Sequence, residues 1–133
     1  MRTVEELMTG KPLDIDYERP VIEAARLMRD ADVGAVPVTK SGVVVGVLTD
    51  HDVTVRLVAA GIDPRTVRTG EVASEDPVTA EPGEDVDVVL RRMSHHRVRR
   101  LPVVDDEGRL VGLLAREDLA RAERETAGRM ARR

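Results

Sequence analysis

The chain has 133 residues, a formal net charge of −4 and 41% apolar residues, which predicts one globular domain with a sizeable core. Its longest apolar run, 43–48, is too short for a membrane span of about 20 residues, and no apolar stretch follows Met1 and Arg2 as in a signal peptide. Because cysteine is absent, disulfides, iron–sulfur clusters and thiol catalysis are excluded. We therefore expect a cytoplasmic protein.

Helices and strands alternate through the first third of the chain. Thr3 and Glu6 have the spacing of a capping box and predict a short helix. Residues 12–16 alternate as a short edge strand does. A helix is expected after Pro20, because the apolar residues that follow recur at i, i+3, i+4 and i+7. These residues are Val21, Ala24, Ala25 and Met28.

A hairpin and a second helix complete this unit. Strands are predicted at 35–39 and 43–49, joined by a turn at Ser41 and Gly42. A helix then begins at Asp50 and is expected to end near Gly61. The helix is expected to turn three apolar residues inward, which are Val53, Leu57 and Val58.

The second half of the chain repeats the first. Pairs of identical residues lie 65 positions apart and, after one inserted residue, 66 apart. They include Pro12 and Pro77, Met28 and Met93, Pro37 and Pro102, Gly46 and Gly112, and Asp52 and Asp118. We place repeat 1 at 3–60, a linker at 61–67 and repeat 2 at 68–124. The Arg-rich tail, 125–133, is expected to be frayed.

Repeat 2 predicts the same element order as repeat 1. A strand is expected at 77–80, a helix at 86–93 and a hairpin from strands 100–104 and 110–115. The last helix begins at Arg116 and is expected to end near Glu125. The fold class is therefore α+β, with two β-α-β-β-α repeats. Because a unit of about 60 residues is marginal alone, we expect the repeats to pack about a pseudo-two-fold axis into one module.

Two motifs occur once in each repeat. The strand motif apolar-Pro-apolar reads Val36-Pro37-Val38 and Leu101-Pro102-Val103. The segment 46–52 reads Gly-x-x-Thr-x-x-Asp and has a partial copy at 112–118. With the repeat order, these motifs resemble a tandem pair of cystathionine-β-synthase-type (CBS) domains, or Bateman module, over about nine-tenths of the chain. Within this family, the chain resembles the small stand-alone bacterial CBS-pair proteins.

The resemblance implies a regulatory module without catalysis of its own. CBS pairs commonly bind AMP, ADP, ATP or S-adenosylmethionine in clefts between the repeats, and they usually form flat homodimers. We therefore expect an adenosine ligand, a homodimer and an unidentified effector protein. The alternative is a structural or protein-interaction dimer with degenerate ligand sites. A nucleic-acid binder is a third possibility, against which the interspersed acidic residues argue.

Thr49 and Asp52 lie where a strand meets a helix N-terminus, whose free N–H groups suit a phosphate. Thr49 can donate its hydroxyl to a phosphate oxygen, and Asp52 can accept from ribose hydroxyls. The same spacing also fits a simple helix cap. The strands expected to offer backbone groups and apolar side chains to an adenine ring contribute Leu13, Ile15, Val36 and Val38.

The second copy of the motif keeps Asp118 but has Ala115 where the hydroxyl belongs. We therefore expect a weaker second site, although Arg116 could compensate by charge. The resemblance places Arg99 and Arg100 at a phosphate, and a solvated basic edge is the alternative. The two ligand sites of the chain are thus predicted to be unequal.

The histidines do not predict a metal site. His95 and His96 are neighbours that point about 100° apart on a helix, and His51 lies elsewhere. No HExxH motif or cysteine completes a ligand set. No nucleophile–base–acid pattern is detectable either, so an enzyme is the least supported class.

Overall fold

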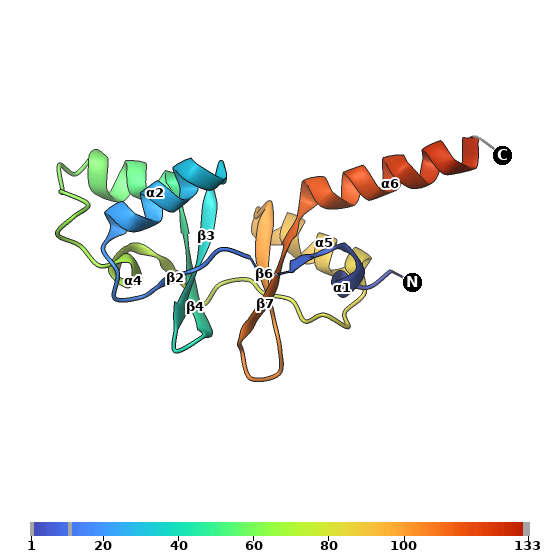
Figure 1. Ribbon diagram of the computed structural model, residues 1–133, viewed down its shortest axis with the longest axis horizontal. Helices are drawn as coiled ribbons and strands as arrows, with labels where there is room; N and C mark the ends of the chain where they lie inside the picture. Colours follow the sequence, from blue (N-terminus) through green and yellow to red (C-terminus); the bar gives the residue numbers. More distant parts are fainter. Residues whose placement is uncertain (1, 11, 132–133) are drawn as a thin grey trace. The chain divides into compact units, whose positions relative to one another are not determined.

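The computed structural model describes residues 2–10 and 12–131 (Figure 1). The chain divides into two compact units. The first-repeat unit comprises Leu13–Pro77 with Glu107–Leu110, and the second-repeat unit comprises Met1–Pro12, Val78–Asp106 and Val111–Arg133. Each unit is a mixed helix and strand structure, as predicted.

The first-repeat unit is built on a four-stranded sheet in the order β2-β3-β4-β5. Strand β2 runs parallel to β3, and the other neighbours are antiparallel. The strands are β2 (Ile15–Asp16), β3 (Ala35–Lys40), β4 (Val43–Thr49) and β5 (Ser74–Glu75). The helices are α2 (Val21–Ala31), α3 (Asp50–Asp52), η1 (Val53–Val58) and α4 (Thr69–Val72).

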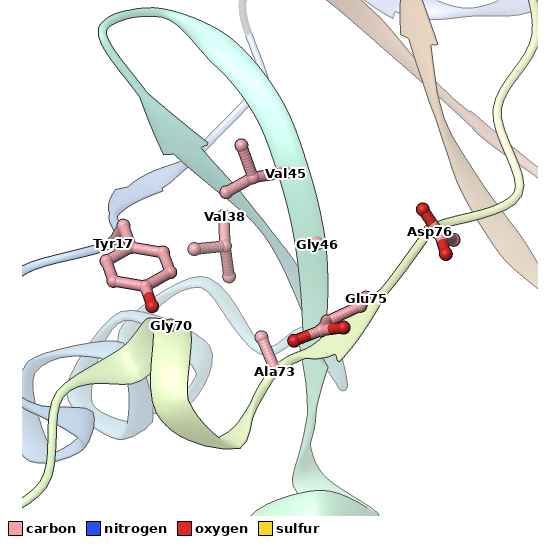
Figure 2. A pocket seen from close by; sticks show the side chains of 8 residues that line it. All are labelled: Tyr17, Val38, Val45, Gly46, Gly70, Ala73, Glu75 and Asp76. Atoms are coloured by element: carbon pink, nitrogen blue, oxygen red, sulfur yellow. The ribbon is translucent and has the colours of Figure 1, made fainter.

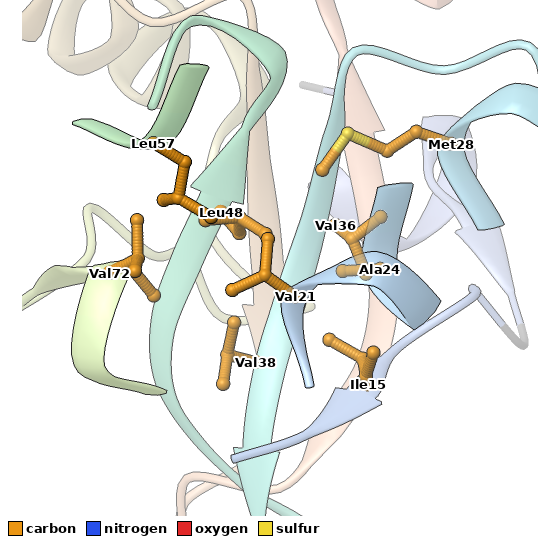
Figure 3. Close-up of a cluster of buried hydrophobic side chains, with 10 residues drawn as sticks. Ile15, Val21, Ala24, Met28, Val36, Val38, Leu48, Leu57 and Val72 are labelled. Carbon is orange, nitrogen blue, oxygen red and sulfur yellow. The ribbon is translucent and has the colours of Figure 1, made fainter. Parts of the chain in front are cut away.

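The core of this unit lies between the helices and one face of the sheet (Figure 3). Helix α2 begins after Pro20, whose φ of −66° suits a helix start, and ends at Asp32, which adopts left-handed backbone angles. The helix buries the residues of the predicted apolar face, except that Ala25 is half-buried. The buried side chains are Ile15, Val21, Ala24, Met28, Val36, Val38, Leu48, Leu57, Val72 and Ala73.

The second-repeat unit has a three-stranded sheet in the order β1-β7-β6. The strands are β1 (Thr9–Gly10), β6 (Arg100–Val104) and β7 (Leu110–Ala115). The helices are α1 (Val4–Leu7), α5 (Val86–His96) and α6 (Arg116–Ala131). Its aliphatic core includes Val4, Val86, Val89, Met93, Leu101, Val103, Leu114 and Leu119.

The two repeats make the same backbone contacts. Asp50 N donates to Gly34 O at 2.9 Å, and Arg116 N donates to Arg99 O at 2.9 Å. The central helices end alike, at Asp32 with φ 54° and at Arg97 with φ 57°. The duplication read from the sequence is therefore also present in the hydrogen bonding.

Each repeat gives its first segment to the sheet of the other. Strand β1 precedes repeat 1's own sheet but pairs with β7, Thr9 opposite Leu113. Strand β5 opens repeat 2 but pairs with β4, Ser74 opposite Val47. The short helices α1 and α4 accompany these strands. The compact units are therefore divided at different residues from the repeats of the sequence.

The prediction of a buried side chain is wrong for one residue. Val58 is 68% exposed, whereas Leu57 is buried and Val53 is half-buried. Segment η1 has the wider π-type winding, as in the hydrogen bond from Ala59 N to Thr54 O at 2.9 Å. Because a wider turn rotates each successive side chain by less than 100°, the α-helical spacing does not identify the buried face here.

Three element boundaries also differ from the prediction, and the first is the strand expected at 12–16, of which only β2 (Ile15–Asp16) forms. The stretch 77–80 forms only a parallel bridge of Ala80 with Val103, because Pro77 has no N–H and Ala80 alone exchanges backbone hydrogen bonds with β6. Helix α6 continues to Ala131, beyond the expected end near Glu125, whereas the fraying of the tail stays a prediction and residues 132–133 lie outside the described part. No helix in the described ranges is long and apolar enough to cross a membrane.

A bidentate ion pair supports the second-repeat unit. Arg92 Nη2 lies 2.6 Å from Glu84 Oε1, Arg92 Nη1 lies 3.0 Å from Glu84 Oε2, and Nη1 also donates to Thr79 O at 2.9 Å. The hydrogen bond from Arg92 holds the pKa of the Glu84 carboxyl below its ordinary value. A depressed folded-state pKa stabilises the fold above the unfolded pKa, and that contribution is lost as the pH falls through the folded value.

We expect Glu84→Gln to lower the free energy of unfolding at pH 7 by about 1 kcal/mol, because a charge-assisted bidentate contact is lost. The difference between wild type and variant should shrink as the pH falls below 4.5, the ordinary glutamate value. Urea unfolding from pH 7 down to pH 3 measures it. A difference that stays constant over that range would contradict this role for the ionised carboxylate.

Candidate functional site

Thr49 and Asp52 form a reciprocal capping box at the junction of β4 and α3. Asp52 N donates to Thr49 Oγ1 at 3.1 Å, and Thr49 N donates to Asp52 Oδ2 at 3.0 Å. Thr49 has extended backbone angles (φ −111°, ψ 160°), which let its side chain reach over the first helical turn. The structure thus contains the helix cap that the spacing of this motif also allowed.

The box leaves hydrogen-bonding capacity on both side chains. Because Thr49 Oγ1 accepts from Asp52 N, the hydroxyl proton is the donor that can turn to a ligand oxygen. The Asp52 side chain is 15% exposed, and its Oδ1 lies 4.0 Å from Arg56 Nε. Each carboxylate oxygen has two acceptor sites, so Asp52 can keep its backbone bond and still accept from a hydroxyl. Cap and ligand site are compatible.

Arg56 was not predicted from the sequence. It lies one helical turn after Asp52, and its Nη1 donates to Val72 O at 2.9 Å. The acid-to-arginine spacing of i, i+4 was the available signal. The position that corresponds to Arg56 in repeat 2 is Ala122.

The second copy of the motif lacks the threonine cap. β7 ends at Ala115, which is buried, and α6 begins at Arg116. The Arg116 side chain donates to Ser94 Oγ, which directs it along α5. Asp118 is half-buried on the first turn of α6. The two motifs therefore differ in structure as they do in sequence.

Arg99 and Arg100 belong to the second-repeat unit, whereas Thr49 and Asp52 belong to the first. Arg99 is exposed, and Arg100 is 28% exposed with its Nη2 2.6 Å from Glu117 Oε1. The pKa of Glu117 is lowered, first by the backbone N–H of Glu117 itself and then by Arg100. Their contact with a phosphate stays a prediction.

The four apolar residues expected near an adenine ring differ in exposure. Leu13 is 46% exposed, and Ile15 is buried under the helices. Val36 and Val38 are completely buried core residues, so their side chains pack the unit. The Val36 side chain is thus not available to lie on a ring, because it faces α2, and only its backbone can take that part (Figure 3).

A family comparison decides what the chain is. The model of the CBS domain matches residues 4–59 and again 70–125. The chain belongs to the CBS domain family. As a tandem pair, it has the arrangement that the repeated motifs indicated.

Curated relatives of this CBS pair cover nearly its whole length. The CBS domain-containing protein YhcV of Bacillus subtilis is 38% identical over 120 residues, which are 90% of this chain and 84% of that protein. Hypoxic response protein 1 of Mycobacterium tuberculosis is 34% identical, over 91% of this chain and 85% of that protein. The family resemblance inferred from the sequence is confirmed.

Solved structures agree with the fold. Hypoxic Response Protein I with two coordinated zinc ions has a TM-score of 0.83 and 32% identity, covering 90% of this chain and 98% of that one. The CBS domain pair of protein MJ0100, in complex with 5′-methylthioadenosine and S-adenosyl-L-methionine, has a TM-score of 0.83 and 25% identity, covering 95% and 98%. The zinc ions and the two adenosine compounds are bound by those two proteins.

The histidines of this CBS pair do not gather with other ligating groups. The His95 and His96 rings pack edge to face with centroids 5.1 Å apart. Among the residues that the structure describes, no three His, Asp or Glu side chains are placed to hold one metal ion. The chain also has no cysteine.

A cavity of about 280 Å³ opens in the first-repeat unit, and sequence reasoning did not predict it (Figure 2). Its walls come from the end of β2, from β3 and β4, and from the α4–β5 segment. The lining residues are Tyr17, Val38, Val45, Gly46, Gly70, Ala73, Glu75 and Asp76. This set shares only Val38 with the residues predicted from the motifs.

Proposed function

We propose that this CBS pair binds an adenosine-containing ligand through Thr49 and Asp52 and passes the binding event to an effector protein. CBS pairs are in general regulatory and not catalytic, and the two matched repeats are residues 4–59 and 70–125 of this chain. The observation that carries the proposal is the reciprocal box, which fixes a hydroxyl donor and a carboxylate acceptor at one helix N-terminus.

The MJ0100 pair supports the ligand class, because its structure contains two adenosine compounds, one of them S-adenosyl-L-methionine. In this proposal, the Asp52 carboxylate accepts from the ribose hydroxyls. The Thr49 hydroxyl faces the part of the ligand beyond the ribose, whereas the three N–H groups of α3 already donate, to Gly34 O, Asp50 Oδ1 and Thr49 Oγ1. Arg99 and Arg100 are proposed to neutralise a phosphate, where the ligand has one.

A structural or protein-interaction role is the second candidate, and Ala115 in the second motif favours it. Three exposed apolar residues also suit self-association. Val55 and Val58 of η1 and the following Ile62 are 49%, 68% and 42% exposed. We expect a homodimer, and one of the solved neighbours is described as hexameric.

A thermal-shift screen of the purified chain against AMP, ADP, ATP, S-adenosylmethionine and adenosine tests the proposal. A ligand at 100 times its dissociation constant adds about 2.7 kcal/mol to stability, which raises Tm by several degrees. Light scattering of the same sample reads the oligomeric state. If no adenosine compound changes Tm while the chain is dimeric, the structural candidate takes first place.

A further inference from the structure

The cavity of the first-repeat unit lies where a methionine side chain packs in the second-repeat unit. Helices α1 and α4 are followed by corresponding C-cap residues, Met8 and Ala73, which lie 65 positions apart. Met8 N donates to Val4 O at 2.8 Å, and Ala73 N donates to Thr69 O at 3.0 Å. The backbone is therefore the same at both positions, and only the side chain differs.

The Met8 side chain occupies the space that Ala73 leaves open. Its sulfur lies against Gly112 so closely that a methyl group on this glycine would overlap it. Gly46 is the residue that corresponds to Gly112, and a methyl group there would overlap the backbone oxygen of Ser74, at 2.5 Å, whereas the nearest side-chain atom, the Ala73 Cβ, would be 3.3 Å away. In the second-repeat unit, an unbranched thioether thus covers the strand glycine. In the first-repeat unit, the same place belongs to the cavity.

The cavity is lined by an aromatic ring and by carboxylates that the corresponding positions of the other repeat lack. Tyr17, the only aromatic residue of the chain, lines it, and the corresponding residue of repeat 2 is Pro82. Glu75 and Asp76 also line it, and the corresponding residues of repeat 1 are Gly10 and Lys11. Figure 2 shows the Glu75 carboxylate turned toward Ala73.

The charges at the cavity favour a cation. The charged residues that line it, Glu75 and Asp76, are both acidic and exposed, and the Lys40 Nζ lies 5.5 Å from the Tyr17 ring centroid. The other lining side chains are apolar or absent: Val38, Val45, Ala73 and two glycines. A cavity near the small end of ligand pockets, about 300 Å³, admits a ligand of few atoms.

We propose that this cavity binds a small organic cation, an ammonium compound with a short unbranched aliphatic or thioether arm. The arm lies over Gly46, where Met8 lies in the other unit, and the ammonium group faces Glu75. The site does not depend on the adenosine ligand proposed above, because it shares neither Thr49 nor Asp52.

Three probes with one thioether arm test the charge preference: methylthiopropylamine, the neutral alcohol methionol, and methylthiopropionate. We expect the amine to bind with a dissociation constant on the order of 1 mM, the alcohol more weakly, and the acid not at all. Amide NMR titration of the full chain measures this, and shifts should centre on Gly46, Gly70 and Glu75. Equal binding of amine and acid, or shifts away from these residues, would overturn the proposal.

Ala73→Met should fill the cavity as Met8 does. We expect it to raise Tm by roughly 2–6 °C and to abolish binding of the amine. Ala127→Met, an exposed position on α6, is the matched control and should leave both unchanged. Amine binding that survives in an Ala73→Met variant of native-like fold would show that the ligand lies elsewhere.

Glu75→Gln separates charge from shape. It should weaken binding of the amine roughly fivefold to tenfold and leave binding of methionol unchanged, because only the charged contact is lost. Asp52→Ala should not alter amine binding, so failure of this site and failure of the adenosine proposal are distinguishable. A loss of amine binding in Asp52→Ala, or none in Glu75→Gln, would contradict the assigned site.

Discussion

Leu48→Ala is expected to lower the free energy of unfolding by about 2–5 kcal/mol, a large part of the 5–15 kcal/mol typical of a small domain. Leu48 is completely buried in β4, where it contacts the core formed with α2 and η1 (Figure 3). The loss combines transfer of the side chain with the cavity that remains, because the surrounding structure relaxes only partially.

Leu114→Ala is the matched change in the second-repeat unit, since Leu114 lies 66 positions later and is also completely buried. Urea unfolding of both variants should show losses of similar size. Val88→Ala on α5 is the exposed control, at 42% exposure, and should change stability by less than about 0.5 kcal/mol. If Leu48→Ala behaved like Val88→Ala, the described core would be wrong.

The elements of each repeat could be predicted because glycines, prolines and apolar residues recur at a fixed offset. Pro20 and the apolar spacing after it located α2, and Gly42 located the β3–β4 turn, where its φ of 82° needs a residue without a side chain. The repeat phase then transferred these assignments to the second half. Local signals were sufficient wherever an element is long and periodic.

The exchange of first segments between the repeats could not be predicted. Strands β1 and β5 have two residues each, too few for a periodic pattern, and their pairing with β7 and β4 is made through backbone atoms. The exposure of Val58 was missed for a different reason. The sequence gives no sign that η1 is wound more widely than an α-helix.

At the candidate site, the Thr49–Asp52 box was predicted because residue type and spacing alone define it. The contact of Arg56 with Val72 O joins residues 16 apart and needed the fold. The cavity could have been suspected, because the repeat alignment sets Ala73 opposite Met8. Only the structure shows that this difference leaves a space lined by Tyr17 and Glu75.

The two motifs should bind ligand unequally, a prediction that rests on the proposed function. A hydrogen bond to a charged phosphate contributes about 1.5–3 kcal/mol. Thr49→Ala should therefore weaken the binding of AMP by roughly 10- to 150-fold and the binding of adenosine much less. Thr49→Ser keeps the hydroxyl and is the matched control. Asp52→Ala should abolish binding of both ligands, whereas Asp118→Ala should have little effect on the tight site.

Calorimetry of the purified chain decides the asymmetry, because it reports both affinity and stoichiometry. We expect one tightly bound nucleotide per chain, since the second motif has Ala115 in place of the hydroxyl donor. Ala115→Thr restores that donor beside Asp118 and should add a second, weaker site, unless the Arg116 contact with Ser94 holds the helix start closed to a ligand. Two equal sites in the wild type, or binding lost in Asp118→Ala and kept in Asp52→Ala, would reverse the assignment. Unequal sites would mean that a chain built from two similar repeats responds to its ligand through the first motif, where Thr49, Asp52 and Arg56 occur together.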